Sequence, residues 1–137
     1  MAPFQQLMCL ETHLRQGFCL HGSPYSIEGD ILPRQAICSS GRPENNQYAV
    51  YAEPDDLRIP CFMAMHVGGG SSYSVRGGVM TVRSRLGKFQ SGYVYILPKD
   101  SFVTDKGAFY SFASVRPVDY VIVTPLLFEL FKNFKPT

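Results

Sequence analysis

A histidine followed by a glycine, at the end of an apolar segment, is the first place where residue types and spacing could do chemistry. His21-Gly22-Ser23 follows Phe18-Cys19-Leu20, which is typical of a short buried strand. An imidazole at a strand end can hydrogen-bond a ligand, and the glycine beside it leaves backbone N–H and C=O groups uncovered. A lone histidine in such a place is more often a structural residue. His21 therefore indicates a binding site only together with a second group.

Tyr51 is that second candidate, because it closes another strand-like segment just before a helix start. The segment is 48–51, and the helix signal Glu53-Pro54-Asp55-Asp56 follows it. Asp55 is the expected N-cap of a helix that runs to about residue 66. A tyrosine at a strand end can present its ring to a planar heterocycle, although packing is its commoner use. His21 and Tyr51 together predict a nucleotide-binding site.

The order of these motifs resembles the ADP-ribosyltransferase fold, in the branch marked by a histidine, a tyrosine and a glutamate. That branch includes diphtheria toxin and the poly-ADP-ribose polymerases. The later segments that are similar to strands of its small bacterial members are 92–98, 101–102 and 111–118. The resemblance implies that NAD binds at His21, Gly22, Ser23 and Tyr51. It implies that His21 hydrogen-bonds the adenosine-side ribose, that the Gly22 backbone holds the nicotinamide carboxamide, and that Tyr51 stacks on the nicotinamide ring.

Enzymes of this family cleave the nicotinamide–ribose bond through an oxocarbenium-like centre and transfer ADP-ribose to an acceptor. The family's glutamate makes the strongest contact to that centre. Ser111 aligns with the glutamate here, and no Asp or Glu lies between Asp105 and Asp119. Loss of a charged hydrogen bond at such a centre typically costs about 10²–10³ in rate. Glu53 is an alternative source of a carboxylate, although a solvated charge at a helix start is its commoner role.

Three interpretations stay open. The first is an NAD-dependent ADP-ribosyltransferase or NAD-cleaving enzyme in which His21, Tyr51 and Ser111 are catalytic, and whose acceptor (protein, nucleic acid, small molecule or water) is unidentified. The second is a non-catalytic module of the same fold that binds a nucleotide or a protein, which Ser111 favours. The third is an RNA 2′-phosphotransferase-like enzyme, whose full set of arginines and histidines we cannot place. The arginines that could line a pyrophosphate or RNA groove are Arg34, Arg42, Arg76, Arg83 and Arg85.

The elements that must position these residues alternate between helix and strand without a βαβ repeat. Helical patterns cover 3–16 and 125–134, and strand patterns lie near 73–84, at 92–97, around 110–115 and at 119–124. This order predicts a single α+β domain over 1–137, with a split, mostly antiparallel β-sheet and a few short helices. The side chains expected to face inward are Ile27, Ile31, Leu32 and Ile37 in the loop-like segment 25–47, and Ile59, Phe62, Met63 and Met65 on the helix after Asp55.

Composition argues against several other classes. Of the 137 residues, 45% are hydrophobic and 18% charged, so the chain can build a core and is too apolar to be disordered. The net charge of +2 and the scattered basic residues give no overall electrostatic signature of a nucleic-acid partner. Four widely spaced cysteines without a C-x-x-C pair predict neither a zinc site nor a disulfide framework, and the triglycine 68–70 lacks the lysine of a P-loop. No segment is apolar over the roughly 18 residues that span a bilayer, and none has the pattern of a secretion signal. We therefore expect a cytoplasmic protein with neither a membrane nor a metal partner.

Overall fold

Three antiparallel strands form the sheet that carries His21. The computed structural model describes residues 2–36, 41–67, 71–84 and 88–131. Its first sheet has the order β1 (Cys19–Ser23), β8 (Gly92–Leu97), β11 (Asp119–Val123). His21 lies opposite Tyr95, and Tyr95 lies opposite Tyr120, so these three side chains share one face. The strands predicted at 92–97 and 119–124 are confirmed, and the one at 18–20 extends through the His21-Gly22-Ser23 tripeptide.

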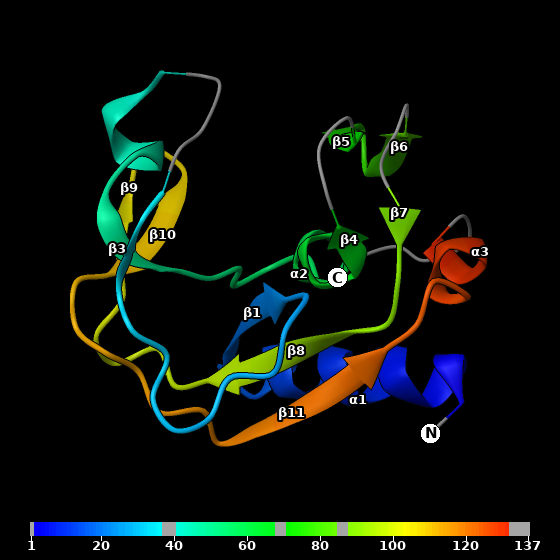
Figure 1. Ribbon diagram of the computed structural model, residues 1–137, viewed down its shortest axis with the longest axis horizontal. Helices are drawn as coiled ribbons and strands as arrows, with labels where there is room; N and C mark the ends of the chain where they lie inside the picture. Colours follow the sequence, from blue (N-terminus) through cyan, green and yellow to red (C-terminus); the bar gives the residue numbers. More distant parts are fainter. Residues whose placement is uncertain (1, 37–40, 68–70, 85–87, 132–137) are drawn as a thin grey trace.

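A second sheet carries Tyr51 and Ser111. Its order is β2 (Arg34–Gln35), β3 (Tyr48–Tyr51), β10 (Ala108–Ser111), β9 (Val103–Asp105), again antiparallel throughout. Figure 1 shows β3, β9 and β10 on the left, apart from the first sheet at the lower centre. An isolated backbone bridge from Leu20 of β1 to Glu53, just after β3, joins the two sheets, and a second bridge pairs Ile31 with Val115 in the segments that connect the sheets. The chain is therefore an α+β protein with mostly antiparallel sheets, as the sequence predicted.

Helices α1 (Pro3–Arg15) and α2 (Arg58–Met65) pack against one face of the first sheet. Leu20, Val94 and Val121 point from the three strands into the core that these helices complete. Pro60 is the third residue of α2, in the first turn, where the N–H that proline lacks would have no partner within the helix. Within the described residues, no helix has both the length and the apolar character needed to cross a membrane.

The opposite face of the first sheet packs against the second sheet. Cys19 and Leu97 from the first sheet meet Val50 from β3, and all three are at most 2% exposed. Ile31 and Val115, which form one of the two bridges, complete this core. The side chains of β1 thus alternate between a helix-covered face and a face that the second sheet covers. His21 and Ser23 belong to the latter.

A hairpin of β5 (Ser71–Arg76) and β6 (Val79–Ser84) covers α2. Its turn is Gly77-Gly78, with φ of +57° and +79°, which is the backbone that a two-residue hairpin turn requires. The ring of Tyr73 lies 5.1 Å from that of Phe62 on α2, and Met80 packs against the core between the first sheet and helices α1 and α2, called the first core below. Strands β4 (His66–Val67) and β7 (Lys88–Phe89) pair at the base of the hairpin, and α3 (Leu127–Phe131) lies beside it in Figure 1.

Several local predictions were wrong in detail. Helix α2 begins at Arg58 with Leu57 at its N-cap, so Asp55 is not the cap; the carboxylate that accepts the Arg58 N–H, at 3.0 Å, belongs to Asp56. Leu32 and Met63 are 62% and 49% exposed instead of inward-facing. The bridge to Val115 turns Ile31 inward and its neighbour Leu32 outward, and Met63 lies on the outer side of α2. Predictions on Ile37, on residues 68–70 and on 132–134 lie outside the described residues.

Candidate functional site

Strands β1 and β3 pair at one point and then separate. Leu20 and Glu53 exchange backbone hydrogen bonds of 2.9 and 2.8 Å. Two residues further along the same antiparallel register, Gly22 would face Tyr51, but this pair does not form, and the Tyr51 carbonyl lies 2.6 Å from His21 Nδ1 instead. We call this place the β1–β3 fork, defined by His21, Gly22, Tyr51 and Glu53. The predicted residues His21 and Tyr51 therefore meet where the two sheets part.

His21 is tied to the fork through one ring nitrogen. Its Nδ1 lies 2.6 Å from the backbone carbonyl oxygen of Tyr51. A carbonyl can only accept, so Nδ1 carries the proton and Nε2 of the neutral ring remains an acceptor. Burial lowers the pKa of His21, as does the positive charge of Arg34, while the hydrogen bond to Tyr51 raises it. Within the described part of the chain, Nε2 makes no hydrogen bond, and it can therefore accept one from a ligand hydroxyl.

Gly22 matters in two ways, through its missing side chain and through its backbone groups. A Cβ there would lie 2.0 Å from the Pro60 carbonyl oxygen and 2.9 Å from the Ala64 nitrogen, so the missing side chain lets α2 lie directly on β1. Backbone groups of alternate strand residues point to the same edge, and those of Leu20 point toward Glu53. The N–H and C=O of Gly22 therefore point into the fork. They are available to a ligand that offers both a donor and an acceptor.

The ring of Tyr51 is held by its own sheet. Its hydroxyl donates to the Glu44 carbonyl at 2.9 Å, in the short 3-10 helix Pro43–Asn45, and accepts the Gln47 N–H at 3.0 Å. The ring lies 5.7 Å from that of Tyr110, on the face of β3 opposite Val50. Contact between His21 and Tyr51 thus runs through the backbone carbonyl. Neither ring stacks on the other.

Arg34 belongs to the same face of the second sheet as Tyr51, since it lies opposite Ala49 on β3. Its side chain is exposed, and its charge contributes to the lowered pKa of His21. A guanidinium within electrostatic range of a neutral imidazole can attract an anionic group without competing for the imidazole's acceptor nitrogen. Of the described arginines that the sequence offered for a pyrophosphate (Arg34, Arg42, Arg76 and Arg83), Arg34 is the one whose charge acts on His21.

The hydroxyls of the two serines among the predicted site residues are hydrogen-bonded within turns. Ser23 Oγ donates to the Tyr25 carbonyl at 2.7 Å. Ser111 is fully buried, its Oγ lies 3.0 Å from the Ala113 carbonyl and 2.8 Å from the Ser101 hydroxyl, and it accepts the Ala113 N–H at 3.1 Å. Ser111 lies opposite Val50, on the other face of β3 from the Tyr51 ring. The structure does not bring Ser111 to the fork.

Relationship to known proteins was tested against family models, curated proteins and solved structures. No significant match to this chain was found. Function must therefore be argued from the residues and their geometry. The described residues contain no group of three or more His, Cys, Asp or Glu placed to hold a metal ion.

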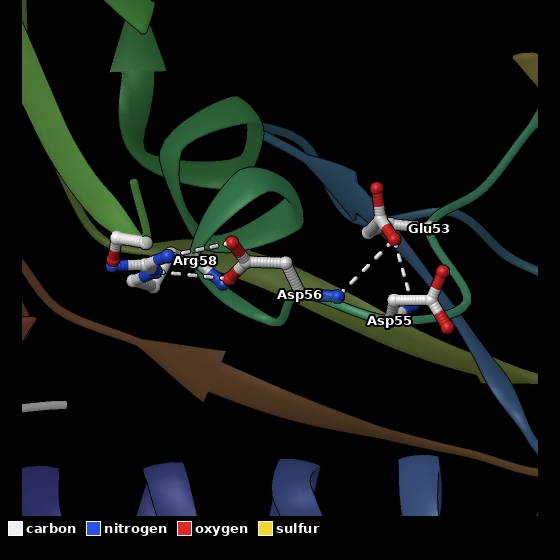
Figure 2. Close-up of polar contacts among 5 residues, drawn as sticks. Glu53, Asp55, Asp56 and Arg58 are labelled. Carbon is white, nitrogen blue, oxygen red and sulfur yellow. Dashed lines mark hydrogen bonds and ion pairs between the residues drawn. The ribbon is translucent and has the colours of Figure 1, made fainter. Parts of the chain in front are cut away.

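Glu53 is the carboxylate of the fork. Figure 2 shows one of its oxygens accepting the backbone N–H groups of Asp55 and Asp56, at 2.7 and 3.1 Å, while the other points away from these contacts. Burial raises the pKa of Glu53, the two hydrogen bonds lower it, and the charges of Asp55 and Asp56 raise it. The half-buried carboxylate therefore closes the turn before α2 with one oxygen and keeps the other unengaged. The sequence had favoured a plain solvated charge for this residue.

Three tyrosines beside His21 escaped the sequence analysis. Tyr93 and Tyr95 on β8 and Tyr120 on β11 form a cluster with ring centroids 5.9 to 6.2 Å apart. Tyr95 is buried and its hydroxyl accepts the Ile27 N–H at 2.6 Å, whereas Tyr120 is 53% exposed. Alternation in Tyr93-Val94-Tyr95 was the signal that could have revealed the cluster, because residues two apart in a strand share a face. The exposed ring extends the His21 face as an aromatic surface.

Proposed function

We propose that the β1–β3 fork binds NAD and that the chain is an ADP-ribosyltransferase-like protein, which cleaves the nicotinamide–ribose bond and transfers ADP-ribose to an acceptor. The observation that carries the proposal is the state of His21. Its Nδ1–H donates to the Tyr51 carbonyl, and its Nε2 remains an acceptor beside the unpaired backbone groups of Gly22. A ribose hydroxyl and a carboxamide are the complementary partners of this pair.

Three parts of NAD have a counterpart among these residues: a ribose hydroxyl, the nicotinamide carboxamide and the pyrophosphate. A ribose hydroxyl donates to His21 Nε2, and the carboxamide of nicotinamide exchanges two hydrogen bonds with the N–H and C=O of Gly22. The pyrophosphate carries the negative charge that Arg34 attracts. The ring of Tyr51 is held against Tyr110, and the backbone carbonyl of Tyr51 is the group that contacts His21. Substrate positioning of this kind supplies a large part of catalysis in group transfer.

The chemistry needs no cofactor beyond NAD itself. The bond between ribose C1′ and the nicotinamide nitrogen breaks, its electron pair leaves with nicotinamide, and an oxocarbenium-like centre remains on the ribose. An acceptor oxygen or nitrogen, or water, then bonds to C1′ and releases its proton. A carboxylate stabilises the positive centre. We assign this role to Glu53, whose backbone pairs with Leu20 at the fork and whose second carboxylate oxygen is unengaged; its side chain lies on the Leu20 side of this pair, and His21 points to the other side.

A second candidate, a module that binds NAD or another nucleotide without cleaving it, is favoured by Ser111. Its hydroxyl is fully used by Ser101 and Ala113 at the position where the family places its glutamate. A glutamate at 111 would bury a carboxylate inside this turn, so Ser111→Glu would destabilise the fold instead of restoring catalysis. Glu53→Gln separates the two candidates. In the enzyme it lowers nicotinamide release and leaves NAD binding intact.

Calorimetry with NAD, followed by chromatographic measurement of nicotinamide, tests the proposal. His21→Asn keeps an N–H donor at the Nδ1 position and removes the Nε2 acceptor. We therefore expect unchanged thermal stability and NAD affinity about tenfold weaker, the value of one hydrogen bond of about 1.4 kcal/mol. His13→Ala, on α1 and away from the fork, is the matched control and should bind like the wild type. No heat with NAD in the wild type, or equal loss in both variants, would refute the proposal.

A further inference from the structure

The outer face of the β5–β6 hairpin gathers hydroxyl and guanidinium groups without any carboxylate. Between residues 57 and 99 the sequence has no Asp or Glu but six Lys or Arg, namely Arg58, Arg76, Arg83, Arg85, Lys88 and Lys99. A hollow of about 380 Å³ lies on the hairpin, lined by Ser72, Tyr73, Ser74, Arg76, Thr81 and Arg83. The fold thus brings two of these basic residues, Arg76 and Arg83, to one hollow.

The two faces of the hairpin have opposite characters. Tyr73 and Met80 belong to the inner face, which packs on Phe62 of α2 and on the first core. The strand register places Ser72 opposite Arg83 and Ser74 opposite Thr81 on the outer face, and Arg76 lies two residues beyond Ser74 on that face. Apart from Tyr73, every side chain named in the hollow comes from this outer face. Val79, opposite Arg76, is the apolar exception on the outer face; otherwise the alternation of β5 and β6 separates a packing face from a polar, cationic one.

Neither arginine of the hollow is neutralised by a carboxylate within the described residues, where the ion pairs are Arg15–Glu11, Arg58–Asp56 and Arg116–Asp30. Both are exposed. Three cross-strand levels follow one another at two-residue steps of roughly 6.8 Å, so the two arginines leave the ribbon roughly 13 Å apart. Hydroxyl donors from Ser74 and Thr81 lie between them. The successive levels of arginine, hydroxyl and arginine can contact several phosphates along a polyanion, whereas one isolated phosphate would meet a single level.

We propose that the outer face of the β5–β6 hairpin binds the phosphate backbone of nucleic acid, without reading its sequence. Arginine and hydroxyl side chains are the usual partners of backbone phosphates. The hairpin cannot enter a groove as a free arm, because its inner face packs on α2 and the Gly78 carbonyl accepts a hydrogen bond from Arg58 at 2.9 Å. Contact is therefore limited to the backbone. Because α2 lies between the hairpin and Gly22 of the β1–β3 fork, this surface is separate from the proposed NAD site.

Fluorescence anisotropy with a labelled 20-bp DNA duplex of mixed sequence, and with the corresponding RNA duplex, tests the proposal between 50 and 200 mM salt. Arg76→Ala/Arg83→Ala should weaken binding about tenfold and make the slope of log K against log salt shallower by about 2, one for each phosphate contact. Scrambling the base sequence should change the affinity of the wild type by less than about twofold, because no base is read. Ser74→Glu, which adds a carboxylate between the arginines, should weaken binding at least as much.

The matched control is Arg15→Ala/Arg116→Ala, which removes two exposed positive charges from other parts of the surface. It should keep the wild-type slope. Thermal unfolding of each variant shows that the fold is retained. Equal weakening by both double variants would overturn the proposal, because net charge alone would then explain the binding. Absence of binding to either duplex, or binding to vesicles containing phosphatidylglycerol in preference to both, would overturn it as well.

Discussion

Replacing Asp56 by Asn should be among the most destabilising exchanges of a partly exposed residue in this protein. Arg58 is 1% exposed, and its Nε and Nη2 donate to the two carboxylate oxygens of Asp56 at 3.0 and 2.8 Å. The remaining nitrogen, Nη1, donates to the Gly78 carbonyl in the hairpin turn. Figure 2 shows this bidentate pair just below the first turn of α2. Asp56→Asn keeps the shape and the cap but leaves a buried guanidinium without its counter-charge.

Removing one partner of a buried ion pair typically costs about 3–5 kcal/mol, because the other charge stays desolvated. The whole domain is stable by about 5–15 kcal/mol, so this single exchange removes a large share. Arg58→Met removes the buried charge and fills a similar volume. It leaves an Asp56 side chain that is 15% exposed and can take up water, and it loses the bond to Gly78, which together cost about 1–3 kcal/mol. The double variant should therefore cost close to Arg58→Met alone.

Urea unfolding followed by far-UV circular dichroism measures these free energies, and a double-mutant cycle gives the coupling. Asp30→Asn is the control, because Asp30 pairs with Arg116 at the surface, where both side chains are exposed, and such pairs contribute roughly 0–1 kcal/mol. If Asp56→Asn costs no more than Asp30→Asn, the buried pair does not stabilise the fold as argued. Strict additivity of the Asp56 and Arg58 exchanges would refute the coupling.

Four further outcomes are expected. Gly22→Ala should cost about 1–3 kcal/mol or more in thermal unfolding, since its Cβ would lie 2.0 Å from the Pro60 carbonyl oxygen and α2 would have to move away from β1. Ser111→Ala should cost about 1–3 kcal/mol in urea, because it leaves buried polar groups without their partner. Burial raises the pKa of Cys19 to about 12, so its thiol should resist a thiol reagent at pH 8 until the chain unfolds. Burial also lowers the pKa of His21, so the unfolded chain takes up this proton first as pH falls. The free energy of unfolding should therefore decline below about pH 6.5, and the decline should be weaker in His21→Asn.

Secondary-structure predictions from the sequence pattern were reliable where contacts between residues close in the sequence decide the structure. A continuous run of apolar and aromatic residues at 92–97 and helical spacing at 3–16 both correspond to observed elements. The start of α2 was misplaced because the carboxylates before it are used differently from the prediction: Glu53 accepts the N–H groups of Asp55 and Asp56, Asp56 accepts that of Arg58, and the helix begins after Leu57. That choice depends on a bridge to Leu20, far away in the sequence.

The sequence by itself placed His21 and Tyr51 on two strands of an α+β fold, and it placed Tyr51 correctly at a strand end, whereas His21 lies in the middle of β1. Only the tertiary structure decided what each group can do. Pairing of β1 with Glu53 points the Gly22 backbone into the fork, the Tyr51 carbonyl selects the tautomer of His21, and a buried turn occupies Ser111. The sequence gives the type of each side chain. Whether its hydrogen-bonding groups are engaged or available depends on strands that meet only in the folded chain.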